Sequence, residues 1–241
     1  MLNALFRYEK DKLLHSGRFV MPLLLLVGYI GIAYAIAPLS ILDSFSICSL
    51  VVFMLMLSMG VMLGALREPA IEQTMLVKLP RPYYLYLGKV LLTAVVSLVF
   101  ALVSALGPLL LHVLGGFNLF TRPVVFSDIA AGIVFFWLTG LCGGMLGLFA
   151  NPRMLPGRKS AVLFSTLIGL LIIVKGALLK AAAALQYVLW LLPPIYDASV
   201  AYSAENYFSF THAWPFLLWL AAYTVAEITM YVLIMRKRRF E

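Results

Sequence analysis

Six long apolar runs alternate with shorter polar segments along the chain. Each run has close to the roughly 20 residues that an α-helix needs to cross the hydrocarbon core of a bilayer. The pattern predicts an all-α integral membrane protein with six transmembrane helices, at about residues 19–37, 44–66, 89–112, 128–150, 161–180 and 214–235.

Lysine and arginine are distributed unequally between the two sets of connecting segments. The two termini and the segments after the second and fourth runs hold 15 of the 18 lysines and arginines, whereas the segments after the first, third and fifth runs hold only Arg122. Cytoplasmic loops carry the excess of positive residues in membrane proteins. We therefore expect both termini in the cytoplasm and a multi-pass location in a cell membrane, either a bacterial inner membrane or a plasma membrane.

The N-terminal segment, residues 1–18, predicts an amphipathic helix that lies flat on the inner leaflet. Leu5 and Phe6 share one face with two further leucines, and Glu9 interrupts that face. An ordinary basic tail is the alternative interpretation. The six-span transmembrane domain then covers residues 19–241.

Two lysines, Lys175 and Lys180, stand toward the outer end of the fifth run. Either they snorkel to the membrane interface or they face a polar cavity. The segment that follows, about residues 181–213, is rich in aromatic residues and contains Pro193-Pro194. It predicts half-buried helices at the outer interface or a re-entrant element.

The composition agrees with a membrane protein. The chain of 241 residues is 63% hydrophobic and 12% charged, with a mean hydropathy of +1.02. Its net charge of +8 comes from short loops and tails, so we expect no nucleic-acid binding. Cys48 and Cys142 lie inside apolar runs and predict free, buried thiols rather than a disulfide or a metal site.

The sequence contains no recognisable catalytic set. The histidines at positions 15, 112 and 212 are isolated, so we expect no metal site. Gly157-Arg158-Lys159-Ser160 resembles the end of a phosphate-binding loop but lacks the upstream glycine. We therefore expect no enzyme activity and no nucleotide site on this chain; if ATP drives it, another chain binds the ATP.

Glu227 is an acidic residue well inside the sixth run. Acids inside a membrane are costly and are usually functional. A proton site, a substrate contact, an ion pair between spans and a hydrogen-bonded packing contact all remain open. One alternative function follows, a stand-alone proton-coupled secondary transporter in which Glu227, Lys175 and Lys180 form a relay.

Glycines cluster in two of the runs at small-x-x-x-small spacing, which lets helices approach closely. The spacing fits packing within one subunit or a subunit interface. The glycines are Gly60 and Gly64 in the second run, and Gly140, Gly143, Gly144 and Gly147 in the fourth run.

A polar stretch at about residues 67–82 joins the second and third runs and carries a helical apolar pattern. Glu68 and Glu72 stand near its start and Lys78 near its end, as the helix dipole favours. Pro80 ends the helix. Because so short a helix is marginal alone in water, we expect it to dock on another protein; an ordinary connecting loop is the alternative.

This stretch resembles the loop between the second and third spans of type 2 ATP-binding-cassette exporter permeases, which carries a coupling helix. The matching residues, in order, are Arg67-Glu68, Glu72-Gln73-Thr74, Leu76, Leu79-Pro80 and Gly88-Lys89. The six spans, the cytoplasmic termini, the N-terminal amphipathic helix and the outer aromatic segment also match. Pro69-Ala70-Ile71 departs from the family, which often has charged or small residues there.

The resemblance implies a half-transporter. Two permease chains, identical or homologous, pair around a central path, and each receives the movement of a cytoplasmic ATPase subunit through its coupling helix. ATP and Mg²⁺ bind to that partner, and no cofactor binds this chain. The family exports drugs, lipids and hydrophobic peptides, so we expect an amphipathic or hydrophobic substrate to leave the cytoplasm. The residues implied in ATPase coupling are Arg67, Glu68, Glu72, Thr74, Met75, Leu76 and Lys78.

Overall fold

The computed structural model describes residues 2–36, 38–66, 73–75, 77, 79, 83–116, 118–150, 157–182, 185–204, 207–208 and 210–237. These residues form helices and no β-strand, as the apolar runs predict. In chain order the helices are α1 (Leu2–Ser16), α2 (Val20–Ala33), α3 (Ile41–Gly64), α5 (Tyr83–Leu114), α6 (Phe126–Phe149), α7 (Arg158–Ala181), α8 (Gln186–Leu189), α9 (Ile195–Ser203) and α10 (Phe210–Lys237).

Five of these helices, α3, α5, α6, α7 and α10, are each long and apolar enough to cross a membrane. The count over the described residues rises to six if α1 and α2, which meet at a bend of 69°, form one broken span. Helix α2 alone has 14 residues, about 21 Å at 1.5 Å per residue, and is shorter than the first predicted run. Beyond it, Leu39 exchanges backbone hydrogen bonds with Leu119 and Thr121, at 2.9 and 3.1 Å.

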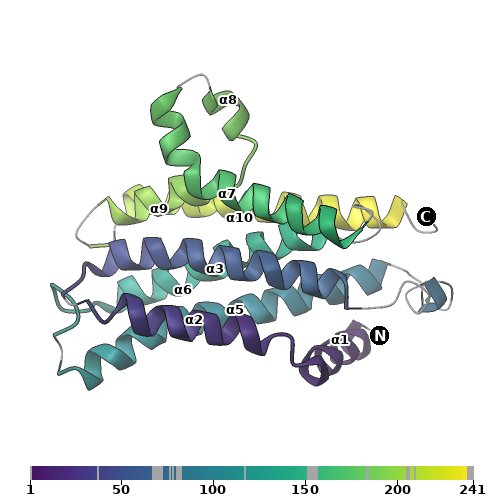
Figure 1. Ribbon diagram of the computed structural model, residues 1–241, viewed down its shortest axis with the longest axis horizontal. Coiled ribbons are helices and arrows are strands. Elements are labelled where there is room, and N and C mark those ends of the chain that lie inside the picture. Colours follow the sequence, from purple (N-terminus) through teal and green to yellow (C-terminus); the bar gives the residue numbers. More distant parts are fainter. Residues whose placement is uncertain are drawn as a thin grey trace.

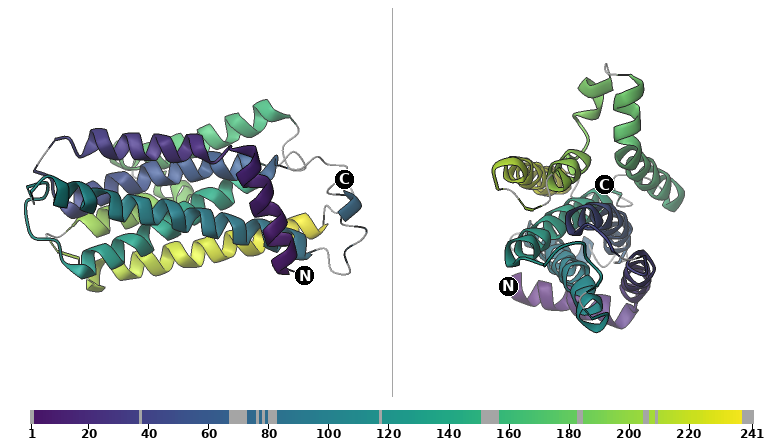
Figure 2. Two further views of the ribbon diagram at one scale, coloured as in Figure 1. Left: turned by 90° about the horizontal axis from the view of Figure 1, so that it is seen from below. Right: turned by 90° about the vertical axis from the view of Figure 1, so that its left-hand side faces the viewer.

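The long helices run side by side, and the start of α1 and the end of α10 lie at the same end of the bundle (Figure 1). The last turn of α3 and the first turn of α5 lie at that end as well (Figure 2). The last turns of α7 and the short helix α8 project away from the other helices in both figures. Helix α1 crosses the bundle end at a steep angle to the long helices.

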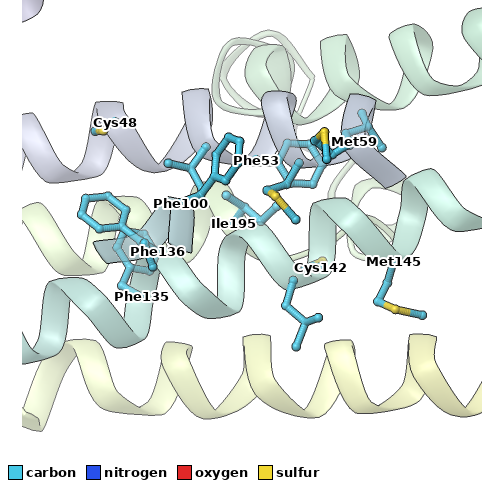
Figure 3. Packing of buried hydrophobic residues seen from close by; sticks show 14 of the residues in the cluster. Cys48, Phe53, Met59, Phe100, Phe135, Phe136, Cys142, Met145 and Ile195 are labelled. Carbon is cyan, nitrogen blue, oxygen red and sulfur yellow. The ribbon is translucent and has the colours of Figure 1, made fainter. Parts of the chain in front are cut away.

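Helices α3 and α6 form the closest contact in the structure, and glycines make it possible. A Cβ atom added to Gly60 would overlap the carbonyl oxygen of Gly144, and one added to Gly147 would overlap the carbonyl oxygen of Leu57. Beside this crossing, the rings of Phe53 and Phe136 lie between the two helices (Figure 3). The predicted glycine faces therefore meet within one chain.

The other predicted glycines lie around the same contact. A Cβ atom on Gly140 would come within 2.6 Å of the Ser97 hydroxyl on α5, and Gly64 is buried at the end of α3. Reciprocal hydrogen bonds then tie α5 to α6: the Ser97 hydroxyl donates to the carbonyl oxygen of Trp137 at 2.8 Å, and the Trp137 indole donates to the carbonyl oxygen of Ala94 at 3.0 Å. Helix α6 is thus held on two sides.

Helix α1 packs across the start of α5. Leu5 and Phe6 contact Gly88, where a Cβ atom would lie 3.7 Å from the Leu5 side chain. Glu9 and Leu13 are buried in α1. The predicted amphipathic face therefore covers protein, and Glu9, which interrupts that face in the sequence, is buried together with it.

Helix α9 is held inside the bundle by hydroxyl groups of α3. The Ser46 hydroxyl donates to the carbonyl oxygen of Ser199 at 2.9 Å, and the hydroxyls of Ser49 and Ser199 are 3.1 Å apart. Protein covers much of this non-spanning segment, as backbone at membrane depth requires. The segment predicted at 181–213 thus consists of a projecting part, α8, and a packed part, α9.

We expect the substitution Gly147→Ala to lower the free energy of unfolding by about 1–3 kcal/mol, since overpacking of a tight contact has that cost. Cys48 and Cys142 are buried free thiols, so a thiol-reactive fluorescent dye reports unfolding during heating in detergent. Gly28→Ala is the matched control, because nothing lies within 4 Å of a Cβ atom at Gly28. Equal unfolding temperatures for the two variants would contradict the crossing described here.

Candidate functional site

A cavity of about 370 Å³ lies between α6, α7, α10 and the segment after α8. Its volume falls in the range typical of small-molecule sites. Glu227 is the one charged residue among those that line it. The other lining residues are apolar or aromatic: Leu146, Phe149, Phe164, Leu191, Tyr223, Ala226 and Met230.

The period of α10 aims three of its side chains at this cavity. Tyr223, Glu227 and Met230 are spaced four and three residues apart, so they share one face of the helix. The Tyr223 hydroxyl donates a hydrogen bond to the carbonyl oxygen of Leu191 at 2.9 Å, which fixes the segment after α8 as one wall. The site therefore lies against one face of α10, and the segment after α8, which is not a span, forms one of its walls.

Glu227 is 5% exposed, its two carboxyl oxygens are fully buried, and neither has a hydrogen-bond partner of ordinary geometry in the described part of the chain. The polar group that interacts with it is the Cys142 thiol of α6. A thiol is only a weak donor, and an isolated carboxylate in an apolar site is strongly disfavoured. Glu227 therefore borders the cavity, but its carboxyl oxygens are enclosed by protein, with most of their bonding capacity unused.

Lys175 and Lys180 do not line this cavity. The Lys175 ammonium bonds to the Asp197 carboxylate of α9 at 2.5 Å, with the lysine side chain 4% exposed. Next to it, Gly176 lets α7 approach the ring of Tyr196 closely. Lys180 is exposed near the end of α7. The structure thus separates the three residues that sequence reasoning placed in one intramembrane polar site.

A second buried charge, Asp128, organises the other end of the bundle. Its carboxylate accepts a hydrogen bond from Arg122 at 2.6 Å and another from the backbone N–H of Phe208 at 3.1 Å. It also accepts a weaker bond, at 3.4 Å, from the N–H of Val125 at the start of α6. The Arg122 guanidinium lies 4.3 Å from the centre of the Tyr207 ring. One carboxylate therefore joins two segments of the chain, residues 122–128 and the segment at Phe208.

Tyr202 of α9 adds to this cluster, because its hydroxyl donates to the carbonyl oxygen of Asp128 at 3.0 Å. Burial, and then the charge of the Asp128 carboxylate, raise the pKa of the Tyr202 phenol, so the hydroxyl keeps its proton. Sequence reasoning missed Asp128 and Asp197. The signal for Asp128 was available: Arg122 is the one basic residue in its set of loops, and an acid follows six residues later.

The predicted coupling segment is described only in part. Gln73, Thr74 and Met75 are helical, as is Val77, and the N–H of Leu79 donates to the carbonyl oxygen of Met75 at 2.9 Å. The Val77 side chain is 74% exposed. The other predicted coupling residues lie outside the described residues; they are Arg67, Glu68, Glu72, Leu76 and Lys78.

Within the described ranges, no group of three His, Cys, Asp or Glu side chains could hold a metal ion. The described architecture, several apolar helices of spanning length around a tightly packed core, is compatible with a multi-pass membrane protein. No protein-family model, curated protein or solved structure matches this chain.

We expect Asp128→Asn to lower the free energy of unfolding by about 3–5 kcal/mol, because it leaves a largely buried guanidinium without its counter-charge. Thermal unfolding in detergent measures the loss. Asp11→Asn is the control, since the Arg7–Asp11 pair is exposed and its atoms are 3.9 Å apart, and such pairs contribute little. An Asp128→Asn variant as stable as the Asp11→Asn variant would show that the cluster does not hold this end together.

Proposed function

We propose that this chain is the membrane-spanning permease subunit of an ATP-driven exporter, which moves an amphipathic or hydrophobic substrate out of the cytoplasm. The observation that carries the proposal is the gathering of parts at one end of the bundle. Helix α1, the end of α10, the end of α3 and the start of α5 lie there (Figure 2). The segments at this end also hold most of the basic residues, as expected of a cytoplasmic face.

Helix α5 offers a route for movement from that end of the bundle into the membrane. Helix α5 begins at Tyr83, directly after the coupling segment, and runs for 32 residues, about 48 Å. It is bonded to α6 through Ser97 and Trp137. A push on the connection would therefore reach α6, one wall of the cavity, through rigid and bonded elements.

The remaining parts of the proposal concern partners. A soluble ATPase subunit binds ATP and Mg²⁺ and docks on the coupling segment, and a second permease chain, identical or homologous, completes the path in the cell membrane. Val77 is the residue that we propose for this docking, because its apolar side chain is exposed within the segment that the resemblance assigns to coupling.

Proton-coupled transport by this chain alone is the second candidate, and Glu227 favours it. A buried carboxyl group without an ordinary hydrogen-bond partner can take up and release a proton. Lys175 does not serve such a relay, because its ammonium is bonded to Asp197. Transport that stops when the proton gradient collapses, while ATP remains high, would favour this candidate over the ATP-driven one.

The first experiment is purification of the tagged full chain from its native host in mild detergent, followed by identification of the proteins that accompany it. A stoichiometric soluble subunit with a phosphate-binding loop is the expected result. A chain that comes out alone and folded under several mild conditions would count against the ATP-driven proposal.

We expect Val77→Asp to weaken the binding of the ATPase subunit about tenfold or more and to lower coupled transport accordingly. Burial of a valine contributes about 1.5 kcal/mol or more, which corresponds to a factor of about ten. Because Val77 is exposed, the variant should fold normally, whereas Met75 is half-buried against the chain itself. Asn3→Asp adds the same charge at an exposed position of α1 and is the control. If the Val77→Asp variant binds the ATPase subunit as tightly as the wild-type chain does, Val77 is not part of the docking surface.

A further inference from the structure

We propose that the cavity between α6, α7 and α10 holds one acyl chain of an anionic phospholipid of the inner leaflet, with the headgroup beside Lys237 at the end of α10. The inference adds a lipid ligand to the proposed permease. It rests on that proposal for one point, the orientation that puts the end of α10 in the cytoplasm. Binding itself requires this chain alone, because all the lining residues belong to it.

The walls of the cavity present no free polar group to a ligand. Phe164 of α7 and Met230 of α10 line it with apolar side chains. The carboxyl oxygens of Glu227 are enclosed by protein, and the Tyr223 hydroxyl is bonded to the carbonyl oxygen of Leu191. Such walls favour a hydrocarbon, which is bound through burial of its surface and requires no hydrogen bond.

The cavity is open on the outer surface of the helix bundle. Met230 and Leu191 line it and are 54% and 74% exposed. Helix α7 packs on α3 and α9, whereas α10 packs mainly on α6, so α7 and α10 stand apart on either side of the cavity (Figure 2). In a chain that spans a membrane, a surface at this depth meets hydrocarbon, and a lipid chain can enter from the side.

The depth of the cavity matches one leaflet. Met230 lies seven residues, about 10 Å, before Lys237, and Tyr223 lies about 10 Å further in. There the hydrogen bond from Tyr223 to Leu191 closes the cavity with the segment after α8. Half of a hydrocarbon core is about 15 Å thick. The cavity is therefore closed near the depth at which the acyl chains of the inner leaflet end.

Basic residues stand at the inner end of the cavity. Lys237 follows Met230 by two turns and so shares its face of α10. Arg236 and Lys237 are both exposed, and Lys159 is exposed in the first turn of α7. Neither of these two described turns contains an acidic residue. The positive charges attract an anionic headgroup and favour it over a zwitterionic one.

The experiment uses the purified full chain in phosphatidylcholine nanodiscs that contain a small fraction of one of two probes. The probes are a phosphatidylglycerol and a phosphatidylcholine that carry the same acyl chain with a diazirine near its middle. After illumination, mass spectrometry measures how much of the chain is labelled and which residues carry the label. Labelling by the anionic probe is expected to saturate, to fall on the inner halves of α7 and α10, and to exceed labelling by the zwitterionic probe about fivefold, as one nearby basic residue would give.

One pair of variants tests the place of the acyl chain. Ala226→Trp fills the cavity and is expected to abolish the saturable labelling. Val225→Trp is the matched control, because it adds the same ring to a position of α10 that is 61% exposed and does not line the cavity. It is expected to leave the saturable labelling unchanged. Thermal unfolding in detergent shows that both variants are folded.

A second pair of variants tests the place of the headgroup. Lys237→Gln combined with Arg236→Gln is expected to remove the preference for the anionic probe, while the label still falls on the same residues. Arg7→Gln combined with Lys10→Gln removes two exposed charges from α1 at the same end of the bundle. This control is expected to keep the preference.

The inference is overturned if labelling rises in proportion to the probe fraction without saturation, which is the behaviour of bulk lipid, or if the two probes label the wild-type chain equally. It is also overturned if folded Ala226→Trp is labelled as strongly as Val225→Trp. These outcomes leave the export proposal intact, because that proposal is tested by the accompanying ATPase subunit. Conversely, saturable labelling of a chain that purifies without an ATPase would support the lipid site and reject ATP-driven export.

Discussion

The rest of the structure depends on the backbone contact between α3 and α6. Apolar side chains gain little by leaving lipid for protein, so helices in a membrane associate through close packing and hydrogen bonds. At Gly60 and Gly147 the two backbones approach so closely that no side chain fits between them. Helix α6 is then bonded to α5 through Trp137 and Ser97. The three helices form a core against which the less buried α7 and α10 are placed.

The peripheral elements are attached to this core by a few polar contacts. Ser46 and Ser49 hold α9 on α3, and the Asp128 carboxylate joins the start of α6 to the segment at Phe208. Lys175 then attaches α7 to α9. Since each of these bonds lies in surroundings with little water, the loss of one partner would leave the other unsatisfied, and that cost keeps the segments in place.

The sequence was sufficient to predict the helical class, the apolar helices and a helix at residues 2–16, because these depend on local periodicity. It did not predict that Leu39, after α2, pairs with Leu119 and Thr121, because these partners lie about 80 positions away in the chain. For the same reason it grouped Lys175 with Glu227. The true partner, Asp197, is set by the way α9 returns into the bundle, and no local pattern records that path. The sequence shows that Glu227 lies inside a span. It does not show the cavity beside Glu227, because that cavity is formed by the packing of four elements.

The walls of the cavity differ in how they are held. The α6 wall belongs to the glycine-based core and can move little without breaking close backbone contacts. The α7 wall is attached through the Lys175–Asp197 pair and the contact of Gly176 with Tyr196, and its last turns stand clear of the bundle (Figure 1). Phe164, the α7 residue that lines the cavity, lies eleven residues before Lys175. The ion pair and the glycine contact therefore hold the far half of α7 on α9, whereas the cavity lies beside its first turns.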